Sequence, residues 1–541
     1  MMKSAPFKPL LLLVCLLSCS VNAATTNAPV AEPAVERHYH TKTPYQPQQA
    51  MSSYQLVPAG YTAVYTQMLA RHGSRGLTGM KSDLAFYNLW SQAQKADALT
   101  DLGKELGPDI LKLMQANFLL GYAVPGISKP GYGNETRQGI DEHTELARRM
   151  HERLTGLFQT ASHVSADNAS PRKILVLTSG KDRAVDSGYF FTQSLLRQQP
   201  GLQASIVYPA SLTPREDKRP QSRQPGTDRF LLYFHKLSGT QDKVTDASDP
   251  LYPTYAASQA YQSYLKSREL QAQEAQILSQ PSLATAAHAV LARLFHTGFI
   301  TELEQGRIKA GNTGTYSFTS EDGKFSNQLT GDGETEIRSP VEAALALYEL
   351  YSAASNMQVE LARLSSGKFT AYMPSEQARV FAAADDAISF YSKGPGTVEN
   401  ADITFRMAGI LLADFFRETD AIASGDLSHL AKLRFAHAEI MIPMASLLGI
   451  EGMSTQQPRS MLYQYSNNAW RGEQVAPMAA NIQWDVYANK QGQTLVRMLY
   501  NERETAFRRD CDAARISPDS YFYDYGRLKN CYQQRISVLK N

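Results

Sequence analysis

The hydrophobic and polar positions along the chain change period several times, and each period predicts a different kind of element. Side chains in residues 63–69 alternate, and β-formers are frequent there, which predicts a strand. Residues 174–177 are a short apolar run, which predicts a strand buried on both faces. Residues 481–487 and 494–502 predict two late strands joined by a hairpin turn at 489–492.

Apolar residues at three- and four-residue spacing predict helices over most of the remaining chain. The predicted helical stretches are 83–120, 188–196, 256–278, 282–299, 340–364, 377–391, 405–416, 427–433 and 440–448. Residues 309–333 are rich in Gly, Thr and Ser and predict a loop or short hairpin. We therefore expect an α/β core, formed by residues 51–228 and 405–541, interrupted by a mainly helical cap at 229–404.

The first residues predict a secretory signal rather than part of the fold. Two lysines precede an apolar run at 10–17, and a small-residue cleavage site follows at 21–23. The run is too short to span a membrane. An alternative is a lipid anchor on Cys19, because residues 16–19 form a poor lipobox. We rank this alternative below simple cleavage. The signal suggests a secreted, periplasmic or outer-membrane-associated bacterial protein.

Residues 24–50 are rich in Ala, Thr, Pro and Gln and lack an apolar period, which predicts a flexible linker. His38 and His40 lie within it, and without a third ligand we interpret them as solvated residues rather than a metal site.

Charge and cysteine content narrow the function classes. The chain has 54 basic and 52 acidic residues, and removal of residues 1–23 leaves 52 of each, so nucleic acid is a poor partner. Any anion site must be a local cluster of positive charge. Outside the signal the cysteines are Cys511 and Cys531, which could close a disulfide of roughly 3 kcal/mol, and export favours that bridge over two free thiols.

Candidate chemistry follows the first two strands. The strand at 63–69 leads into Arg71-His72-Gly73-Ser74-Arg75, and Arg183 follows the strand at 174–177. Open α/β sheets bind ligands at the carboxyl ends of their strands. Guanidiniums give bidentate forks to phosphoryl oxygens, and a neutral histidine can attack phosphorus. On its own, the first motif would favour a surface turn with incidental charges.

Three segments together resemble branch 2 of the histidine phosphatase superfamily. They are residues 71–75, residues 173–187 and residues 433–439, and a looser similarity covers 481–502. The third segment contains His437-Ala438-Glu439, where classical acid phosphatases carry His-Asp; His-Ala-Glu is similar to the multiple inositol polyphosphate phosphatases. The chain departs from the family pattern at Gly76-Leu77, where a proline is common after the second arginine.

The resemblance implies a three-layer α/β core with a mainly parallel sheet, plus a helical cap, and it implies residue roles. His72 would be the nucleophile and Glu439 the general acid. Phosphate would be held by Arg71, Arg75, Arg183 and His437, with no metal or cofactor. The implied substrates are inositol polyphosphates, phytate above all. Lys81, Lys181 and Arg434 lie near the motifs in sequence and are candidate pocket cations, whereas we interpret His143 as a packing residue.

Three other functions remain to be weighed. A broad acid phosphatase acting on sugar phosphates is the main alternative. A non-catalytic phosphate-binding protein would be expected to carry damage at Arg71, His72 or Glu439, and all three are intact. A cytosolic mutase-like transferase would not suit a signal peptide.

Overall fold

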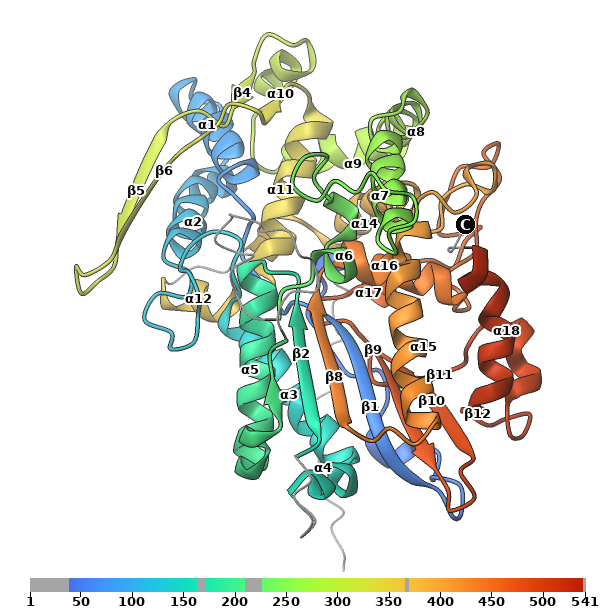
Figure 1. Cartoon of the computed structure of the whole chain (residues 1–541). Coiled ribbons are helices and arrows are strands. Elements are labelled where there is room, and N and C mark those ends of the chain that lie inside the picture. The colour runs from blue at the N-terminus through green and yellow to red at the C-terminus, as the bar shows by residue number, and fades with distance from the viewer. Residues whose placement is uncertain (1–37, 163–170, 210–225, 365–368, 539–541) are drawn as a thin grey trace, which may run out of the picture. The chain divides into compact units, whose positions relative to one another are not determined.

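The fold is built on one mixed sheet, seen in the lower half of Figure 1. The computed structural model describes residues 38–162, 171–209, 226–364 and 369–538, so the predicted signal at 1–23 lies outside the described residues. The strand order is β11-β10-β9-β1-β8-β2-β3, and β12 pairs with β10. The strands are β1 (Thr62–Arg71), β2 (Lys173–Thr178), β3 (Ile206–Val207), β8 (His429–Ala436), β9 (Asn481–Ala488), β10 (Thr494–Tyr500), β11 (Arg503–Thr505) and β12 (Phe522–Asp524).

The parallel half of the sheet brings the three motifs together. Strand β8 lies between β1 and β2 and is parallel to both, with Arg71 opposite Ala436 and Thr178 opposite Phe435. The residues that follow these strands therefore meet at one edge, as sheets of this kind require. Strands β9, β10, β11 and β12 pair antiparallel, so the sheet is mixed rather than mainly parallel. The predicted α/β class with a helical domain is confirmed.

Helices cover both faces of the sheet. Alternation along β1 and β8 directs Met68, Ala70, Leu433 and Phe435 toward one layer, and Leu69 toward the other. The first layer contains α3 (Arg137–Arg153), α4 (Thr155–Ser162) and α5 (Asp182–Gln198), and the second contains α15 (Gly409–Ala423), α16 (Ala438–Leu448) and α18 (Tyr525–Val538). The short helix α17 spans Gly472–Val475.

The middle of the chain is largely helical, as its periodicity predicts. Its helices are α6 (Arg229–Leu232), α7 (Tyr252–Tyr264), α8 (Arg268–Leu278), α9 (Pro281–Leu291), α10 (Thr297–Glu304), α11 (Pro340–Ala354), α12 (Gln358–Arg363), α13 (Phe369–Tyr372) and α14 (Ser375–Ser392). The Gly-rich segment forms the hairpin of β5 (Thr315–Thr319) and β6 (Ser326–Thr330), flanked by β4 (Ala310–Gly311) and β7 (Glu336–Ile337).

The helical part also includes an excursion from the first half of the core. Helices α1 (Ser82–Lys95) and α2 (Asp101–Phe118) lie in the upper left of Figure 1, where α1 packs against both α2 and α11. The N–H of Thr100 donates to the carbonyl of Leu294, and the N–H of His296 donates to that of Ala98. The cap is therefore assembled from two separate stretches of sequence.

Two local predictions were wrong. Residues 427–433 were expected to be helical, but they enter β8, where the side chains alternate between two buried layers. Residues 38–50 were expected to be linker, but Tyr39, His40 and Tyr45 are buried. His40 bonds Asp386 through Nδ1 and Ser389 through Nε2, so this segment is fastened to α14; residues 24–37 lie outside the described part.

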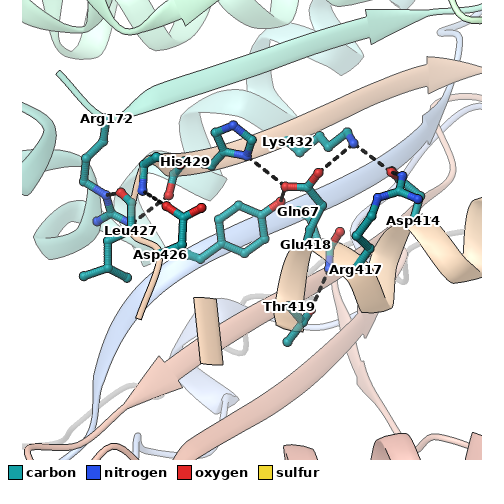
Figure 2. Close-up of polar contacts among 12 residues, drawn as sticks. Gln67, Arg172, Asp414, Arg417, Glu418, Thr419, Asp426, Leu427, His429 and Lys432 are labelled. Atoms are coloured by element: carbon teal, nitrogen blue, oxygen red, sulfur yellow. Dashed lines mark hydrogen bonds and ion pairs between the residues drawn. The ribbon is translucent and has the colours of Figure 1, made fainter. Parts of the chain in front are cut away.

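Arg434 is a structural residue, which corrects its assignment to the pocket. It lies in β8 on the face covered by α15, its side chain is fully buried, and it donates to Asp414 Oδ2 and to Gln67 Oε1. The same face holds Lys432, which lies 2.8 Å from both Asp414 and Glu418, as Figure 2 shows. Burial opposes ionisation of Asp414, but Arg434, Lys432 and Arg417 outweigh it and hold its pKa well below its usual range.

We therefore predict that Arg434→Met destabilises the protein without changing substrate affinity. Removing one partner of a buried ion pair typically costs about 3–5 kcal/mol of unfolding free energy. The depressed pKa of Asp414 means that its contribution is complete above its ordinary pKa and is lost as the pH falls below it. Denaturant unfolding at neutral pH measures the loss. A parent-like stability combined with a raised KM would restore Arg434 to the pocket.

The C-terminal region carries the expected disulfide. Cys511 and Cys531 are bonded, with their Cα atoms 5.7 Å apart, and the bridge ties α18 to the 3-10 turn at Arg509–Ala514. Among the helices in the described part of the chain, none combines the length and apolar character needed to cross a bilayer.

Candidate active site

The loop after β1 is fixed by backbone bonds from several elements. The N–H of His72 donates to the carbonyl of Ala436 at 3.0 Å, and the carbonyl of His72 accepts from the N–H of Ala479 at 3.0 Å. The N–H of Gly73 donates to Glu135 Oε1 at 3.0 Å. The loop is thus tied to the ends of β8 and β9 and to the segment before α3, which fixes the position of His72.

Gly73 permits a close approach between this loop and α3. A Cβ added there would lie 2.5 Å from the carbonyl oxygen and 2.7 Å from the Cα of Gly139. Gly139 is equally confined, because its Cβ would lie 2.2 Å from the carbonyl oxygen of Ser74. Backbone cannot yield as a flexible side chain can, so both positions require glycine.

We predict that Gly73→Ala lowers kcat by about 100-fold, because a displacement of roughly 1 Å at a catalytic group has effects of that size. The added methyl would push the loop off α3 and carry His72 with it. Steady-state kinetics on protein with a parent-like circular dichroism spectrum measures the loss. Gly298→Ala is the matched control, since nothing lies within 4 Å of a Cβ at Gly298. A parent-like kcat for Gly73→Ala would contradict the packing argument.

His72 is held in the neutral form that nucleophilic attack would require. Its side chain is buried, and Nδ1 lies 2.9 Å from the carbonyl oxygen of Gly73. Because a carbonyl only accepts, Nδ1 carries the proton and Nε2 keeps its lone pair. Burial and the positive charges of Arg183 and Arg71 hold the pKa of His72 well below its usual range. The imidazole is therefore neutral at neutral pH, with the lone pair of Nε2 free, as attack on phosphorus requires.

Three guanidiniums surround His72. Arg71 donates through Nη1 to the carbonyls of Thr41 and Ala476, and Arg75 donates to the carbonyl of Gly76 at 2.6 Å. Burial lowers the pKa of Arg71 to about 10 and that of Arg75 to about 9, so both stay charged at neutral pH. Within the described residues, Nε of Arg71, Arg75 and Arg183 has no hydrogen-bond partner.

His437 completes this shell from the start of α16. Its ring centroid lies 5.4 Å from that of His72 in an edge-on arrangement. Ser179, at the end of β2, places its Oγ 2.8 Å from His437 Nε2. When that hydroxyl donates, the proton of the neutral ring sits on Nδ1, which has no partner in the described part of the chain. His437 can then donate to an anion beside His72.

Glu439 lies in the first turn of α16, two residues after His437. Lys393, which follows α14, places its Nζ 3.5 Å from Glu439 Oε1. Burial alone would raise the pKa of Glu439, but Lys393, His235 and His437 outweigh it and hold that pKa well below its usual range. An anion bound beside Lys393 offsets its charge and raises the pKa of Glu439 toward its usual range.

The sequence analysis missed several residues of this site. Tyr233 and His235 follow the short helix α6, and their ring centroids lie 5.8 Å and 6.4 Å from that of His437. Burial lowers the pKa of His235 to about 3. Glu135 accepts a hydrogen bond from the N–H of Gly73. These residues belong to no sequence motif. The one sequence signal is Gly139, because a glycine inside a helix often marks a close backbone contact.

The two remaining candidate cations lie in different environments. Lys181 places its Nζ 5.2 Å from the centre of the Tyr233 ring, which itself packs against His437. Lys81 is about half-exposed and pairs with Asp332 at 3.4 Å and Glu334 at 3.2 Å. His143, interpreted as a packing residue, is buried beneath Arg71 and places Nε2 3.1 Å from the carbonyl oxygen of that residue.

Comparison with known families agrees with this geometry. The model of the histidine phosphatase superfamily (branch 2) matches residues 64–501, which include all three motifs. This chain belongs to that family. It is accordingly a phosphoric monoester hydrolase. A comparison with curated proteins finds no match.

Solved structures extend the comparison. The chain is similar to the multiple inositol polyphosphate phosphatase of Bifidobacterium longum in complex with inositol hexasulfate, with 32% identity and a TM-score of 0.77 over 92% of this chain and 97% of that one. The complex of that enzyme with phosphate gives a TM-score of 0.79 at the same identity and coverage. A phytase from D. castellii shares the fold, with a TM-score of 0.54 and 12% identity over 92% of this chain and 84% of that one.

Proposed function

We propose that this phosphatase hydrolyses phosphomonoesters of inositol polyphosphates, phytate above all, through a phosphohistidine on His72. The observation that carries the proposal is a neutral His72 among three guanidiniums, with Glu439 two residues beyond His437. The substrate class rests on the His-Ala-Glu sequence and on the similarity to the Bifidobacterium enzyme.

In the first step, Nε2 of His72 attacks phosphorus in line, and the bond from phosphorus to the ester oxygen breaks. Arg71, Arg75 and Arg183 stabilise the charge on the phosphoryl oxygens, and His437 donates a further hydrogen bond. Glu439 gives its proton to the departing alkoxide. In the second step, water attacks phosphorus and passes a proton to Glu439. The bond between phosphorus and Nε2 breaks, so phosphate leaves and His72 is restored.

Substrate binding prepares Glu439 for this role. In the free enzyme, neighbouring cations keep its carboxyl ionised, and a phosphate dianion bound beside them offsets their effect. The pKa of Glu439 then rises toward the range in which it can donate a proton.

We propose that the site accommodates a substrate with more than one phosphate. Lys393 and Lys181 lie beside Glu439 and Tyr233, outside the shell around His72. We propose that Lys181 contacts a phosphate that is not being cleaved, and we retain Lys81 as a more distant candidate. Residues of the mainly helical part of the chain, including Lys393 after α14, would then set the substrate range.

The pH profile tests the link between Lys393 and Glu439. Because Lys393 lowers the pKa of Glu439, Lys393→Met should raise it. A general acid loses activity as the pH rises through its pKa, so the basic limb of kcat/KM should move to higher pH. Lys95→Met, on the exposed end of α1, is the control and should leave the limb in place. If the basic limb of kcat/KM in Lys393→Met stayed at the parent's pH, Glu439 would not be the general acid.

Phosphate release from phytate in the presence of EDTA tests the proposed substrate. Purified residues 24–541 should release phosphate from phytate with a higher kcat/KM than from glucose 6-phosphate. Release from sugar phosphates alone would instead establish the broad acid phosphatase. Binding of phytate without turnover would establish a non-catalytic ligand-binding protein.

We also propose that the protein works outside the cytoplasm. The apolar run at 10–17 and the Cys511–Cys531 bridge support export, since disulfides persist in oxidising compartments. Fractionation of cells that express the full chain should place it in the periplasm or medium, with its N-terminus at residue 24; a lipid-modified Cys19 would establish the anchored form instead.

A further inference from the structure

A large cavity lies at the other end of β1 from His72. Its volume is about 1030 Å³, and its lining includes Thr62, Ala63 and Val64 at the start of β1. At about 3.3 Å per residue, Val64 and Arg71 lie roughly 23 Å apart along the strand. The cavity is therefore separate from the site around His72, and its volume suits a small organic ligand.

Arg153, at the last residue of α3, gives this cavity an unusual cation. Its side chain is only 6% exposed, and none of its three guanidinium nitrogens has a hydrogen-bond partner among the described residues. Asp485 lies 3.5 Å from Nε, but that carboxylate also serves Arg497 at 3.2 Å. Buried N–H donors without acceptors are costly, so the guanidinium is placed to receive an acceptor from the cavity.

The other two arginines of the lining differ from Arg153. Arg172 donates to the backbone carbonyls of Leu427, Val64 and His429. Arg497 donates to Glu504 and to the hydroxyl of Tyr487. They contribute positive charge to the cavity, whereas Arg153 alone among the three lacks any hydrogen bond within the described part of the chain.

The rest of the lining is largely apolar and aromatic. Leu154, Leu157 and Tyr54 contribute to the wall, and the ring of Tyr54 lies 5.9 Å from the Cζ of Arg153. At the rim, Leu56 is 91% exposed, and Val57 and Leu427 are also exposed. Exposed apolar side chains gathered at the mouth of a cavity mark a binding site for an apolar group. The one acidic lining residue, Glu152, pairs with Arg148.

We propose that this cavity binds an amphipathic anion. A carboxylate, sulfonate or phosphate head would accept hydrogen bonds from Arg153. An apolar or aromatic body would lie against Tyr54, Leu154 and Leu157 and extend toward Leu56. The site is independent of the catalytic function proposed above.

Two fluorescent probes with nearly the same aromatic body test the proposal. They are 8-anilino-1-naphthalenesulfonate, which carries a sulfonate, and N-phenyl-1-naphthylamine, which is uncharged. Because hydrogen bonds to charged groups are the stronger kind, the sulfonate should bind the parent about tenfold more tightly. Equal affinities would overturn the role of Arg153, and complete displacement by an equal concentration of inorganic sulfate would overturn the need for an apolar body.

Variants assign the binding to this cavity. Arg153→Gln should reduce sulfonate affinity about tenfold and leave the uncharged probe unaffected. Gly156→Phe should weaken both probes, because Gly156 lines the cavity and nothing lies within 4 Å of a Cβ there. Arg307→Gln, an exposed arginine after α10 that does not line the cavity, is the control and should change neither. Unchanged binding in Gly156→Phe, which leaves every buried ion pair intact, would place the probes elsewhere and refute the site.

Discussion

Replacing His72 with alanine should abolish phosphate release from phytate and leave the fold intact. The variant keeps the arginine shell but lacks the atom that attacks phosphorus. Removing the nucleophile of a covalent mechanism typically costs at least about 10⁴-fold in kcat. The bonds that position the loop run through the backbone of His72 and Gly73, so the substitution leaves them in place.

The measurement compares phosphate release and ligand binding in the same variant. His72→Ala should bind inositol hexasulfate with an affinity within about threefold of the parent, because most of the binding charge comes from the three arginines. His288→Ala replaces an exposed histidine of the cap and should retain full activity. Release by His72→Ala within tenfold of the parent rate would exclude His72 as the nucleophile.

Glu439→Gln should separate the two chemical steps. With phytate, the alkoxide cannot leave without a proton, so the first step should slow by about 10²–10⁴-fold. With p-nitrophenyl phosphate, nitrophenolate leaves unaided, and the first step should stay fast. The second step loses its base with either substrate, so nitrophenol should appear in a rapid burst of about one equivalent followed by slow turnover.

Stopped-flow absorbance and rapid-quench analysis of phosphate measure these two outcomes. Glu451→Gln, an exposed residue beyond the end of α16, serves as the control and should show parent kinetics with both substrates. An equal loss in the first step for both substrates would show that Glu439 acts on phosphoryl transfer in general rather than on the leaving group.

The sequence predicts which residues gather around His72, because they lie at or just after the ends of strands. Arg71 ends one strand and His72 follows it, Arg183 follows a second, and His437 follows a third. Parallel pairing then brings the strand ends together without further information, since β8 lies between β1 and β2. The helices of the cap were predicted for a similar reason, because their apolar spacing is local.

Residues whose role depends on distant partners were not predictable in this way. Arg434 is three residues from His437 in sequence, but strand alternation turns it toward Asp414 on α15. The residues around His40 have the composition of a linker, but His40 bonds Asp386 on α14, which lies 346 residues later in the chain. Lys393 carries no motif, and only the folded chain places it beside Glu439.

The antiparallel half of the sheet shows the same division. Strands β9 and β10 and the turn between them were predicted from local alternation. Their pairing beside β1 was not, because a mainly parallel sheet was expected from the family resemblance. The antiparallel neighbour has a direct consequence for the site: β9 begins at Asn481, so the preceding residues Ala479 and Ala480 reach the backbone of His72 and Arg71.

Trapping the covalent intermediate tests the central claim most directly. The parent would be mixed with phytate in the presence of EDTA, quenched in alkali during turnover, and analysed by peptide mass spectrometry. The proposed mechanism predicts a phosphoryl group on His72 that disappears when the substrate is exhausted. It also predicts that, with p-nitrophenyl phosphate, a larger fraction of the enzyme carries a phosphoryl group on His72 in Glu439→Gln than in the parent. Turnover without any phosphoryl group on His72, or with the group on another residue, would contradict it.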